Sequence, residues 1–199
     1  GSEMCIRDRP YQQSASKGYE ADGLLYLKSG SKEQNILAKQ GDDLRIDWGY
    51  FYMVAGKENT AYSVGNSTEL RKNFVNGTLN SASLEGEDSN GNMALVRSHG
   101  KVKNVTDKIM LGYDDIYSIQ YFGTNLRPYW NSKGDRTIEA EMLAAYNEYD
   151  KLLARCYAFD KKLMEDASAA GGKEYAELCA LAYRQSIAAV SYTHLTLPT

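Results

Sequence analysis

The sequence has few of the residues that build metal sites and disulfide frameworks, with three cysteines and two histidines among 199 residues. Two of these five, Cys5 and His194, lie in terminal stretches that are interpreted below as foreign to the protein. The remaining Cys156, Cys179 and His99 match no zinc-site spacing, so neither a metal nor another cofactor is predicted. Cysteines placed in this way are more often small buried hydrophobic residues than a disulfide pair. His99, beside a glycine, indicates a turn or a strand end rather than a catalytic base.

Long apolar runs and a strong charge of one sign are also missing. No apolar run approaches the ~20 residues that a helix needs to span a bilayer. The formal net charge of −3 offers no electrostatic footprint for nucleic acid or for an anionic membrane. We therefore expect neither a nucleic-acid partner nor a membrane span. Tyrosine, in contrast, is abundant, with 16 residues against four phenylalanines.

The two ends of the chain mirror each other in the genetic code. Met4–Asp8 can be written in the codons ATG TGT ATA AGA GAC, and the reverse complement of these codons, GTC TCT TAT ACA CAT, translates as Val190–His194. Selection on a protein has no reason to produce this relation, whereas a DNA adapter ligated in both orientations to a sequenced fragment produces it automatically. We therefore interpret residues 1–9 and 190–199 as adapter-derived, as in a metagenome fragment, and exclude them from fold reasoning. The protein is then expected to be cut at both ends.

Residues 10–123 alternate as β-strands do. In "DLRIDWGYFYMVA" a period of two places an aromatic-rich face on a core. That face consists of Leu44, Ile46, Trp48, Tyr50, Tyr52 and Val54. The stretches "GLLYLKSG", "QNILAKQGDD", "NMALVRSHGKV" and "DKIMLGYDDIYSIQYFG" also predict strands, and "EGEDSNGN" predicts a polar turn. The stretch "TELRKNFVNG" predicts one short helix, with Thr68 as N-cap and Gly77 as its end. Several strands with almost no helix favour an antiparallel β-sandwich.

Helical patterns replace the strands after a linker at 124–136 that is rich in Gly, Asn, Pro, Ser and Lys. The stretch 137–189 predicts three helices, the second of which ends at Gly171-Gly172. The first helix carries an apolar stripe of Ile138, Met142, Ala145, Tyr149, Leu152 and Cys156. The third carries Tyr175, Leu178, Cys179, Ala182 and Ile187 on or near one face. The fold class predicted for the whole chain is α+β.

Three aromatic-rich strings, "DDLRIDWGYFYMVA", "LGYDDIYSIQYFGTNLRPYW" and "YAELCALAYRQSIAA", together resemble the glutaminase A family of large bacterial and fungal proteins. The resemblance covers most of residues 20–189 in the right order. It implies the C-terminal part of a β-sandwich, a linker, and the first helices of a six-hairpin α/α toroid. It also implies hydrolysis of L-glutamine to L-glutamate and ammonia, with a small-molecule substrate, and an extracellular or periplasmic location for the whole protein. Most of the toroid is missing, so this chain is expected to hold only part of the site and to be inactive alone.

The adjacent carboxylates Asp114 and Asp115 are weak candidates for catalysis. Neighbours on a strand point to opposite faces, so in an extended stretch they do not form one acid–base pair. At a strand end or bulge, one of them could face a cleft as general acid or base. The alternative is a turn held by local hydrogen bonds of the Asp side chains.

Two further groups are candidates for substrate binding. In "NLRPYW", Pro128 stiffens a loop in which Arg127 could clamp a carboxylate while Tyr129 and Trp130 wall a pocket. The alternative is an anchor that fixes the linker onto the helices. In "YRQS", Arg184 and Gln185 interrupt an apolar helix. A buried guanidinium needs a partner, so either a structural ion pair or a substrate ligand is expected at Arg184.

Two other functional classes are alternatives to the glutaminase hypothesis. Sandwich-plus-toroid architecture also occurs in glycoside hydrolases, in which two carboxylates flank the scissile bond and aromatic platforms suit sugars. A non-catalytic structural or binding module is the third class.

Overall fold

The computed structural model describes residues 14–38, 48–78 and 92–193, with side chains described as far as Ser186. The chain divides into two compact units, Gly1–Leu143 and Ala144–Thr199, each of which is described by itself. The first unit contains antiparallel sheets, and the second is helical. The α+β class predicted from the sequence is therefore confirmed.

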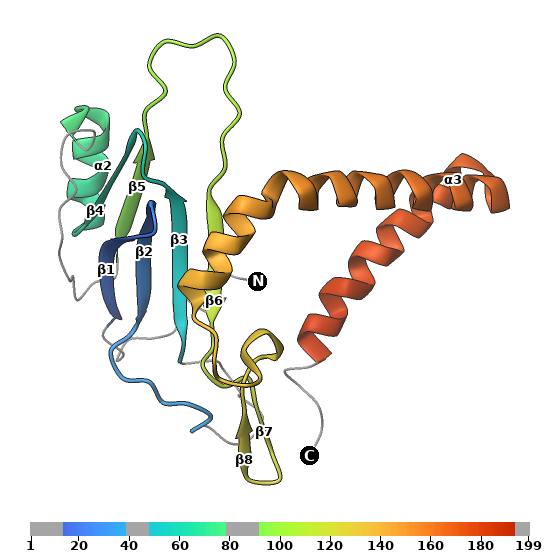
Figure 1. Ribbon diagram of the computed structural model, residues 1–199, viewed down its shortest axis with the longest axis horizontal. Coiled ribbons are helices and arrows are strands. Elements are labelled where there is room, and N and C mark those ends of the chain that lie inside the picture. The colour runs from blue at the N-terminus through green and yellow to red at the C-terminus, as the bar shows by residue number, and fades with distance from the viewer. Residues whose placement is uncertain (1–13, 39–47, 79–91, 194–199) are drawn as a thin grey trace. The chain divides into compact units, whose positions relative to one another are not determined.

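The centre of the first unit is a four-stranded antiparallel sheet in the order β1-β2-β3-β6 (Figure 1). Its strands are β1 (Ser14–Ala21), β2 (Leu24–Ser31), β3 (Tyr50–Gly56) and β6 (Met110–Asp114). Asp22 and Gly23 join β1 to β2, both with positive φ, as a two-residue hairpin turn requires. In register, Tyr19 lies opposite Tyr26, and Tyr26 lies opposite Val54.

A second, two-stranded sheet packs on one face of the four-stranded sheet. It pairs β4 (Thr60–Val64) with β5 (Met93–Arg97). The contact is a hydrophobic cluster in which Leu25, Leu27 and Tyr62 are buried. The partly buried side chains around them are Met53, Val64, Met93 and Leu95. Two antiparallel sheets with one shared core form a sandwich arrangement.

The opposite face of the four-stranded sheet is covered by the first turns of α3 (Ile138–Thr193). Ile138 and Met142 are buried there, and Tyr26 and Tyr52 of the sheet are almost inaccessible. Because the sheet is covered on both faces, four consecutive β2 residues, Leu24–Leu27, are all buried. A strand with one solvated face would have alternated instead.

Several predicted elements of the first unit differ in detail. The strand predicted at "QNILAKQGDD" is wrong for its described part, 34–38, where the chain turns and Leu37 has a φ of 51°. The short helix is confirmed as α2 (Ser67–Val75), but Asn66 is the N-cap, and its side chain accepts a hydrogen bond from the Thr68 N–H. Gly77, with a φ of 70°, follows the helix end as predicted. The positions 44 and 46 and most of the polar turn at 85–92 lie outside the described residues.

The region expected to be a linker contains regular structure. β7 (Ile119–Tyr121) pairs with β8 (Thr124–Leu126) as an antiparallel hairpin, and the 3-10 turn η2 (Tyr129–Asn131) follows. The expected linker at 124–136 therefore begins as the second strand of a hairpin. Figure 1 shows this hairpin as a separate two-stranded ribbon.

The second unit is a pair of helical arms joined at Gly172. α3 runs without interruption as far as Gly171, so the first and second of the three predicted helices form one helix, and their separation is wrong. The stretch where they meet contains no proline or glycine and carries i,i+4 ion pairs such as Lys162–Asp166, at 2.8 Å. The break predicted at Gly171-Gly172 is confirmed, because Gly172 has φ 82° and ψ −176°.

The two arms contact each other within the second unit. The rings of Phe159 and Tyr183 lie 5.1 Å apart between centroids, and Ala167 and Ala176 are buried. Several large apolar side chains of the arms stay exposed, among them Tyr157 and Leu178. No helix in the described part of the chain is long and apolar enough to cross a membrane.

Candidate functional site at the β7–β8 hairpin

Asp114, the last residue of β6, and Asp115 begin the tight turn that leads out of this strand. The Asp114 carboxylate accepts a hydrogen bond from the Ile116 N–H at 3.0 Å, and that of Asp115 accepts one from the Ser118 hydroxyl at 2.5 Å. Ile116 has a φ of 59°, a conformation that such side-chain hydrogen bonds support. Both carboxylates thus stabilise the turn by local hydrogen bonds. This is the second of the two alternatives that the sequence allowed, the first being a role as general acid or base.

This turn is anchored to the start of β3 by residues that the sequence did not single out as site residues. The Trp48 indole N–H donates to the Tyr117 carbonyl at 2.9 Å, and the Tyr113 hydroxyl donates to the Trp48 carbonyl. Gly49 has a φ of 90°, and a Cβ there would lie 2.6 Å from the Asp114 carbonyl oxygen. Glycine is therefore required at this crossing. The available signal was the Trp-Gly pair at the head of an aromatic strand.

Arg127 leaves the end of β8 and stacks on the turn. Its guanidinium carbon lies 5.1 Å from the centroid of the Tyr117 ring. The Ser118 N–H donates to the Leu126 carbonyl at 2.9 Å, which fixes the base of the hairpin. Gly134 packs behind the side chain, since a Cβ there would lie 3.1 Å from the Arg127 Nε. Because Arg127 is exposed, its remaining donors face solvent and can receive a carboxylate in the bidentate manner.

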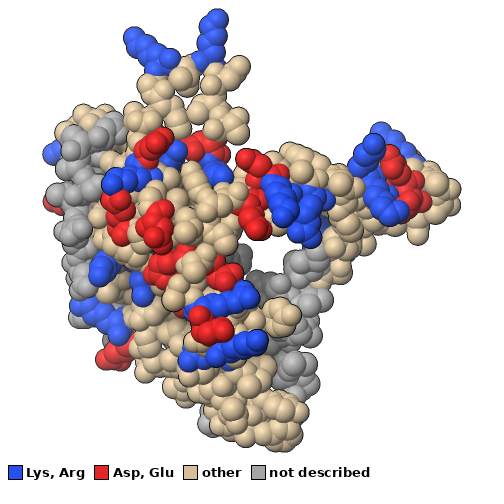
Figure 2. Space-filling view, in the orientation of Figure 1, with Lys and Arg blue, Asp and Glu red and all other residues tan. Residues whose placement is uncertain are grey.

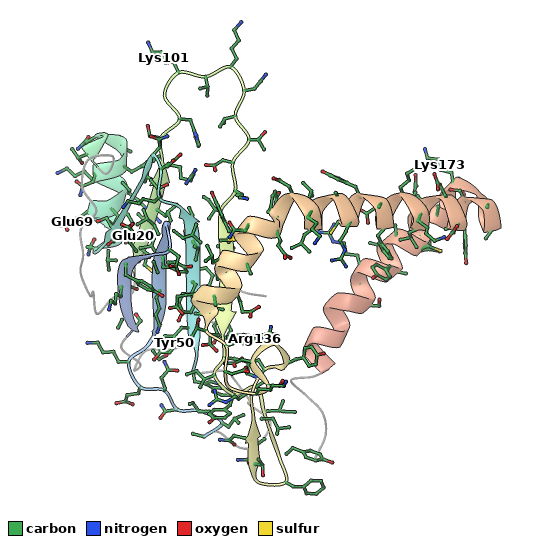
Figure 3. The ribbon with its side chains drawn as sticks, viewed as in Figure 1. Glu20, Tyr50, Glu69, Lys101, Arg136 and Lys173 are labelled. Carbon is green, nitrogen blue, oxygen red and sulfur yellow. The ribbon has the colours of Figure 1, made fainter. Side chains whose placement is uncertain are left out.

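Tyr129 and Trp130 follow Arg127 in the sequence and lie on η2. Tyr129 is 97% exposed, while Trp130 is half-buried. The Asn131 side chain accepts a hydrogen bond from the Arg136 N–H at 3.0 Å, which closes the loop. Arg136, labelled in Figure 3, marks this end of the loop. Arg127 thus lies on the Asp turn through the Tyr117 ring, and the two aromatic residues follow it along the chain on η2.

Arg184 and Gln185 lie elsewhere, on the second arm of α3. Both residues are exposed within the described chain, so the expectation of a buried guanidinium at Arg184 is wrong. The apolar pattern around them is real, but no other element covers it in the described unit. They belong to the second compact unit.

The chain matches a protein family described as a domain of unknown function, DUF5127, over residues 1–166. The chain belongs to the DUF5127 family. The match includes every hairpin candidate and ends before Arg184 and Gln185. It begins at residue 1, and the adapter origin of residues 1–9 stays a prediction. No curated protein and no solved structure matches the chain.

A second polar cluster of this DUF5127 chain joins the sheet to α3. The Tyr19 hydroxyl donates to the Glu139 carboxylate at 2.6 Å, and the Tyr26 hydroxyl donates to the Glu139 carbonyl at 3.3 Å. The Tyr19 and Tyr26 rings stack at 5.2 Å. Burial, followed by the nearby Glu139 carboxylate, raises the pKa of Tyr19, Tyr26 and Tyr52 above the usual tyrosine value. These hydroxyls therefore stay neutral hydrogen-bond donors at physiological pH.

The tyrosine cluster makes the DUF5127 chain sensitive to alkali. A pKa that folding raises stabilises the native state fully below the unfolded value of about 10, and that stability is lost as the pH rises further. We expect the free energy of unfolding, measured with urea from pH 8 to 11, to fall above pH 10. Tyr19→Phe should lower it by about 1 kcal/mol at pH 8 and flatten the alkaline decline. Tyr129→Phe, at an exposed ring, should match the parent throughout, and an equal change in both variants would contradict this assignment.

A third cluster lies at the base of the 98–109 loop. Asp107 accepts a hydrogen bond from the Arg97 guanidinium, and the His99 Nε2 lies 3.0 Å from the same carboxylate oxygen. Burial alone would raise the pKa of Asp107, but the hydrogen bonds from Arg97 and the Lys108 N–H, with the nearby charges, hold it below the usual value. Arg97 also donates to the Gly56 carbonyl at 2.7 Å. The cluster ties the loop to the β3–β4 connection, and His99 lies just after β5, as its strand-end reading predicted.

The cysteines differ from the expectation of buried hydrophobic residues. Cys156 is exposed and Cys179 is half-buried, and both are free thiols. Cys156 is exposed because it lies in the stripe of α3 beyond the part that packs on the sheet. Among the described residues, no group of three or more His, Cys, Asp or Glu side chains could hold a metal ion. On the face shown in Figure 2, acidic and basic side chains are intermixed over the strands.

Proposed function

We propose that this chain is part of a glutaminase A-like amidohydrolase, which hydrolyses L-glutamine to L-glutamate and ammonia, and that it supplies part of the substrate site. The observation that carries the proposal is the exposed Arg127 guanidinium, held on the Tyr117 ring and followed along the chain by Tyr129 and Trp130. An α-amino acid offers a carboxylate that a fixed guanidinium binds with two parallel hydrogen bonds. The order of sandwich and helices, together with the three aromatic-rich strings, supports the same proposal.

The proposal divides the chemistry between this chain and the rest of the protein. Amide hydrolysis needs an activated water or nucleophile and donors for the oxyanion. Asp114 and Asp115 already accept hydrogen bonds inside their own turn, so they act in positioning the hairpin. Arg127 holds the substrate carboxylate, and the catalytic groups come from the helical toroid that the resemblance implies.

The test uses the protein encoded by the uninterrupted gene. We expect ammonia release from L-glutamine, and we expect Arg127→Ala to raise KM about tenfold, the effect of losing a charge-assisted hydrogen bond, with a smaller change in kcat. Arg127→Lys should recover only part of the loss, because a lysine cannot form the bidentate contact. Arg71→Ala, at an exposed arginine of α2, is the matched control and should leave both constants unchanged. No ammonia above background at high enzyme concentration would refute the glutaminase proposal.

A carbohydrate-active enzyme is the second candidate, because aromatic rings lie open on the hairpin. Phe122 is 91% exposed and Tyr129 is 97% exposed, and exposed rings are suited to stacking on sugars. The Gln120 and Asn125 side chains, hydrogen-bonded to each other at 3.0 Å, lie between the strands. A panel of glycosides assayed beside glutamine separates the two candidates. Hydrolysis of a glycoside without ammonia release would favour this class, and activity on neither would favour a binding module.

A further inference from the structure

The apolar stripe on the first arm of α3 continues beyond the part that packs on the sheet. Ile138 and Met142, where the stripe begins, are buried. The members that follow are exposed, namely Ala145, Tyr149, Leu152 and Cys156. Tyr149 is 40% exposed and Leu152 is 38% exposed, although both are large apolar side chains. Apolar side chains that gather on one exposed face are typical of an interaction surface.

The spacing of these four exposed residues is that of a coiled coil. They follow one another at steps of four, three and four positions, which is the repeat of the a and d positions. This arm has no break before Gly172, so the four side chains stay on one face. In the same repeat Glu148 and Arg155 occupy g positions, each directly before an a residue. Side chains at g reach across to the partner helix, and their ion pairs decide the orientation in which two helices pair.

Glu148 and Arg155 are exposed charges for which the described residues supply no counter-ion. The ion pairs described on α3 join other residues. Seven positions separate Glu148 from Arg155, so they cannot pair on one helix, where partners lie three or four positions apart. The residues three and four positions from Arg155 are not acidic, and they are Lys151, Leu152, Ala158 and Phe159. Both charges are therefore available to a second helix.

An antiparallel copy of the same segment matches both charges at once. The two-fold axis then passes between positions 151 and 152. Glu148 of one copy lies opposite Arg155 of the other, and the symmetry forms this pair twice. In the core, Tyr149 of each copy packs against Leu152 of the other. In a parallel pair, Glu148 would instead face the apolar Leu153 and stay without a counter-ion.

We propose that residues 145–156 of α3 form an interface between two copies of this chain, which pair antiparallel about this axis. The apolar and charged side chains of the segment bury about 500 Å² on each copy, or about 1,000 Å² in total. This area is near the lower limit for a specific interface, so the dimer is expected to be weak, with a Kd in the micromolar range. None of these residues belongs to the glutaminase proposal, of which the interface is independent.

Sedimentation equilibrium of the full chain under reducing conditions tests the interface. We expect a monomer–dimer equilibrium whose Kd rises with added salt, because the ion pairs lie at the solvated edge of the interface. Glu148→Lys should raise Kd about tenfold, since it sets like charges opposite each other in both symmetric pairs. Glu148→Lys combined with Arg155→Glu exchanges the two charges and should restore the Kd of the parent. A monomer at every concentration up to about 1 mM, or no recovery in the double variant, would overturn the proposal.

Asp150→Lys is the matched control for Glu148→Lys. It makes the same reversal of charge on an exposed residue of the same arm, but position 150 is a b position and lies outside the contact between the helices. Its Kd should equal that of the parent. Equal Kd values for Glu148→Lys and the parent would show that the copies associate through another face, which contradicts the proposal.

Disulfide trapping tests the antiparallel register in a chain in which Cys5 and Cys179 are replaced by serine. Ala145→Cys then places a thiol in the same core layer as Cys156 of the other copy. The two positions lie about 16 Å apart along one helix, so they cannot form a disulfide within one copy. We expect mild oxidation to give a covalent dimer of the Ala145→Cys variant and none of Ala154→Cys, at an f position on the opposite side of the helix. A disulfide between two Cys156 side chains in the chain without Ala145→Cys would indicate a parallel pair and overturn the proposal.

Discussion

Replacing Gly18 by alanine is expected to lower the free energy of unfolding by about 3 kcal/mol, the upper part of the usual range for an overpacked core. A Cβ at this position would lie 2.0 Å from Cε2 of the Tyr62 ring. Tyr62 is buried between the two sheets against Leu25 and Leu27, so the ring has no free space into which to move. The sheets would have to separate, and urea unfolding followed by circular dichroism measures the cost.

Two variants show whether the Gly18 effect comes from this contact. Gly65→Ala adds the same methyl group where no atom lies within 4 Å, and it should change stability by less than about 0.5 kcal/mol. In a double variant, Gly18→Ala with Tyr62→Ala, the clash is gone, so the two losses should be strongly non-additive. Additive losses would show that Gly18 acts through something other than Tyr62.

Replacing Gly172 by alanine is expected to destabilise the helical unit by about 2 kcal/mol, because a side chain at φ 82° and ψ −176° is strained. The sign of the change in stability distinguishes the kinked conformation at Gly172 from a regular helix. In a regular helix the same substitution would stabilise by about 1 kcal/mol, since alanine has the higher helix propensity. Thermal unfolding followed by circular dichroism gives the sign.

Ala169→Gly is the matched control for Gly172→Ala. Ala169 is an exposed residue inside the first arm of α3, so its replacement should cost about 1 kcal/mol through helix propensity alone. If Gly172→Ala raised the unfolding midpoint, the two arms would form one straight helix in solution, and the contact between Phe159 and Tyr183 would be lost.

The strands that the sequence predicted are those with a strong apolar pattern. It missed β8, which lies in the expected linker, and it missed β1 and β4, for which there is a physical reason. β1 turns Ser16 and Gly18 toward the second sheet, because the Tyr62 ring occupies the space that larger side chains would need. β4 is short and follows a tight turn in which Asn59 has positive φ. Neither segment carries the apolar alternation by which a strand is recognised. Their place is fixed by pairing and by packing partners far away in the sequence.

In the candidate site, too, the residues that are close in the sequence could be predicted, whereas the contacts between distant residues could not. Arg127, Tyr129 and Trp130 lie within four residues, so one loop brings them together and the sequence alone could group them. The contact between Tyr19 and Glu139 spans 120 positions, and no local pattern indicates it. The burial expected for Arg184 depended on a neighbouring element that the described unit does not contain. Local chemistry was therefore predictable, while tertiary contacts were not.

The border between the two compact units falls inside a helix, after Leu143. The first turns of α3 carry Ile138 and Met142, which cover the sheet, and Glu139, which binds its tyrosines. The portable module is therefore the sandwich together with these turns. If the chain were truncated within 124–136, or fused to another protein there, the first turns of α3 would be lost. The face of the sheet that they cover would then be exposed, with Tyr26 and Tyr52. A fusion that keeps the first unit intact must therefore be made inside α3, after Leu143. The protein fused there must begin with a helix whose residues continue the rotation of α3 about its axis.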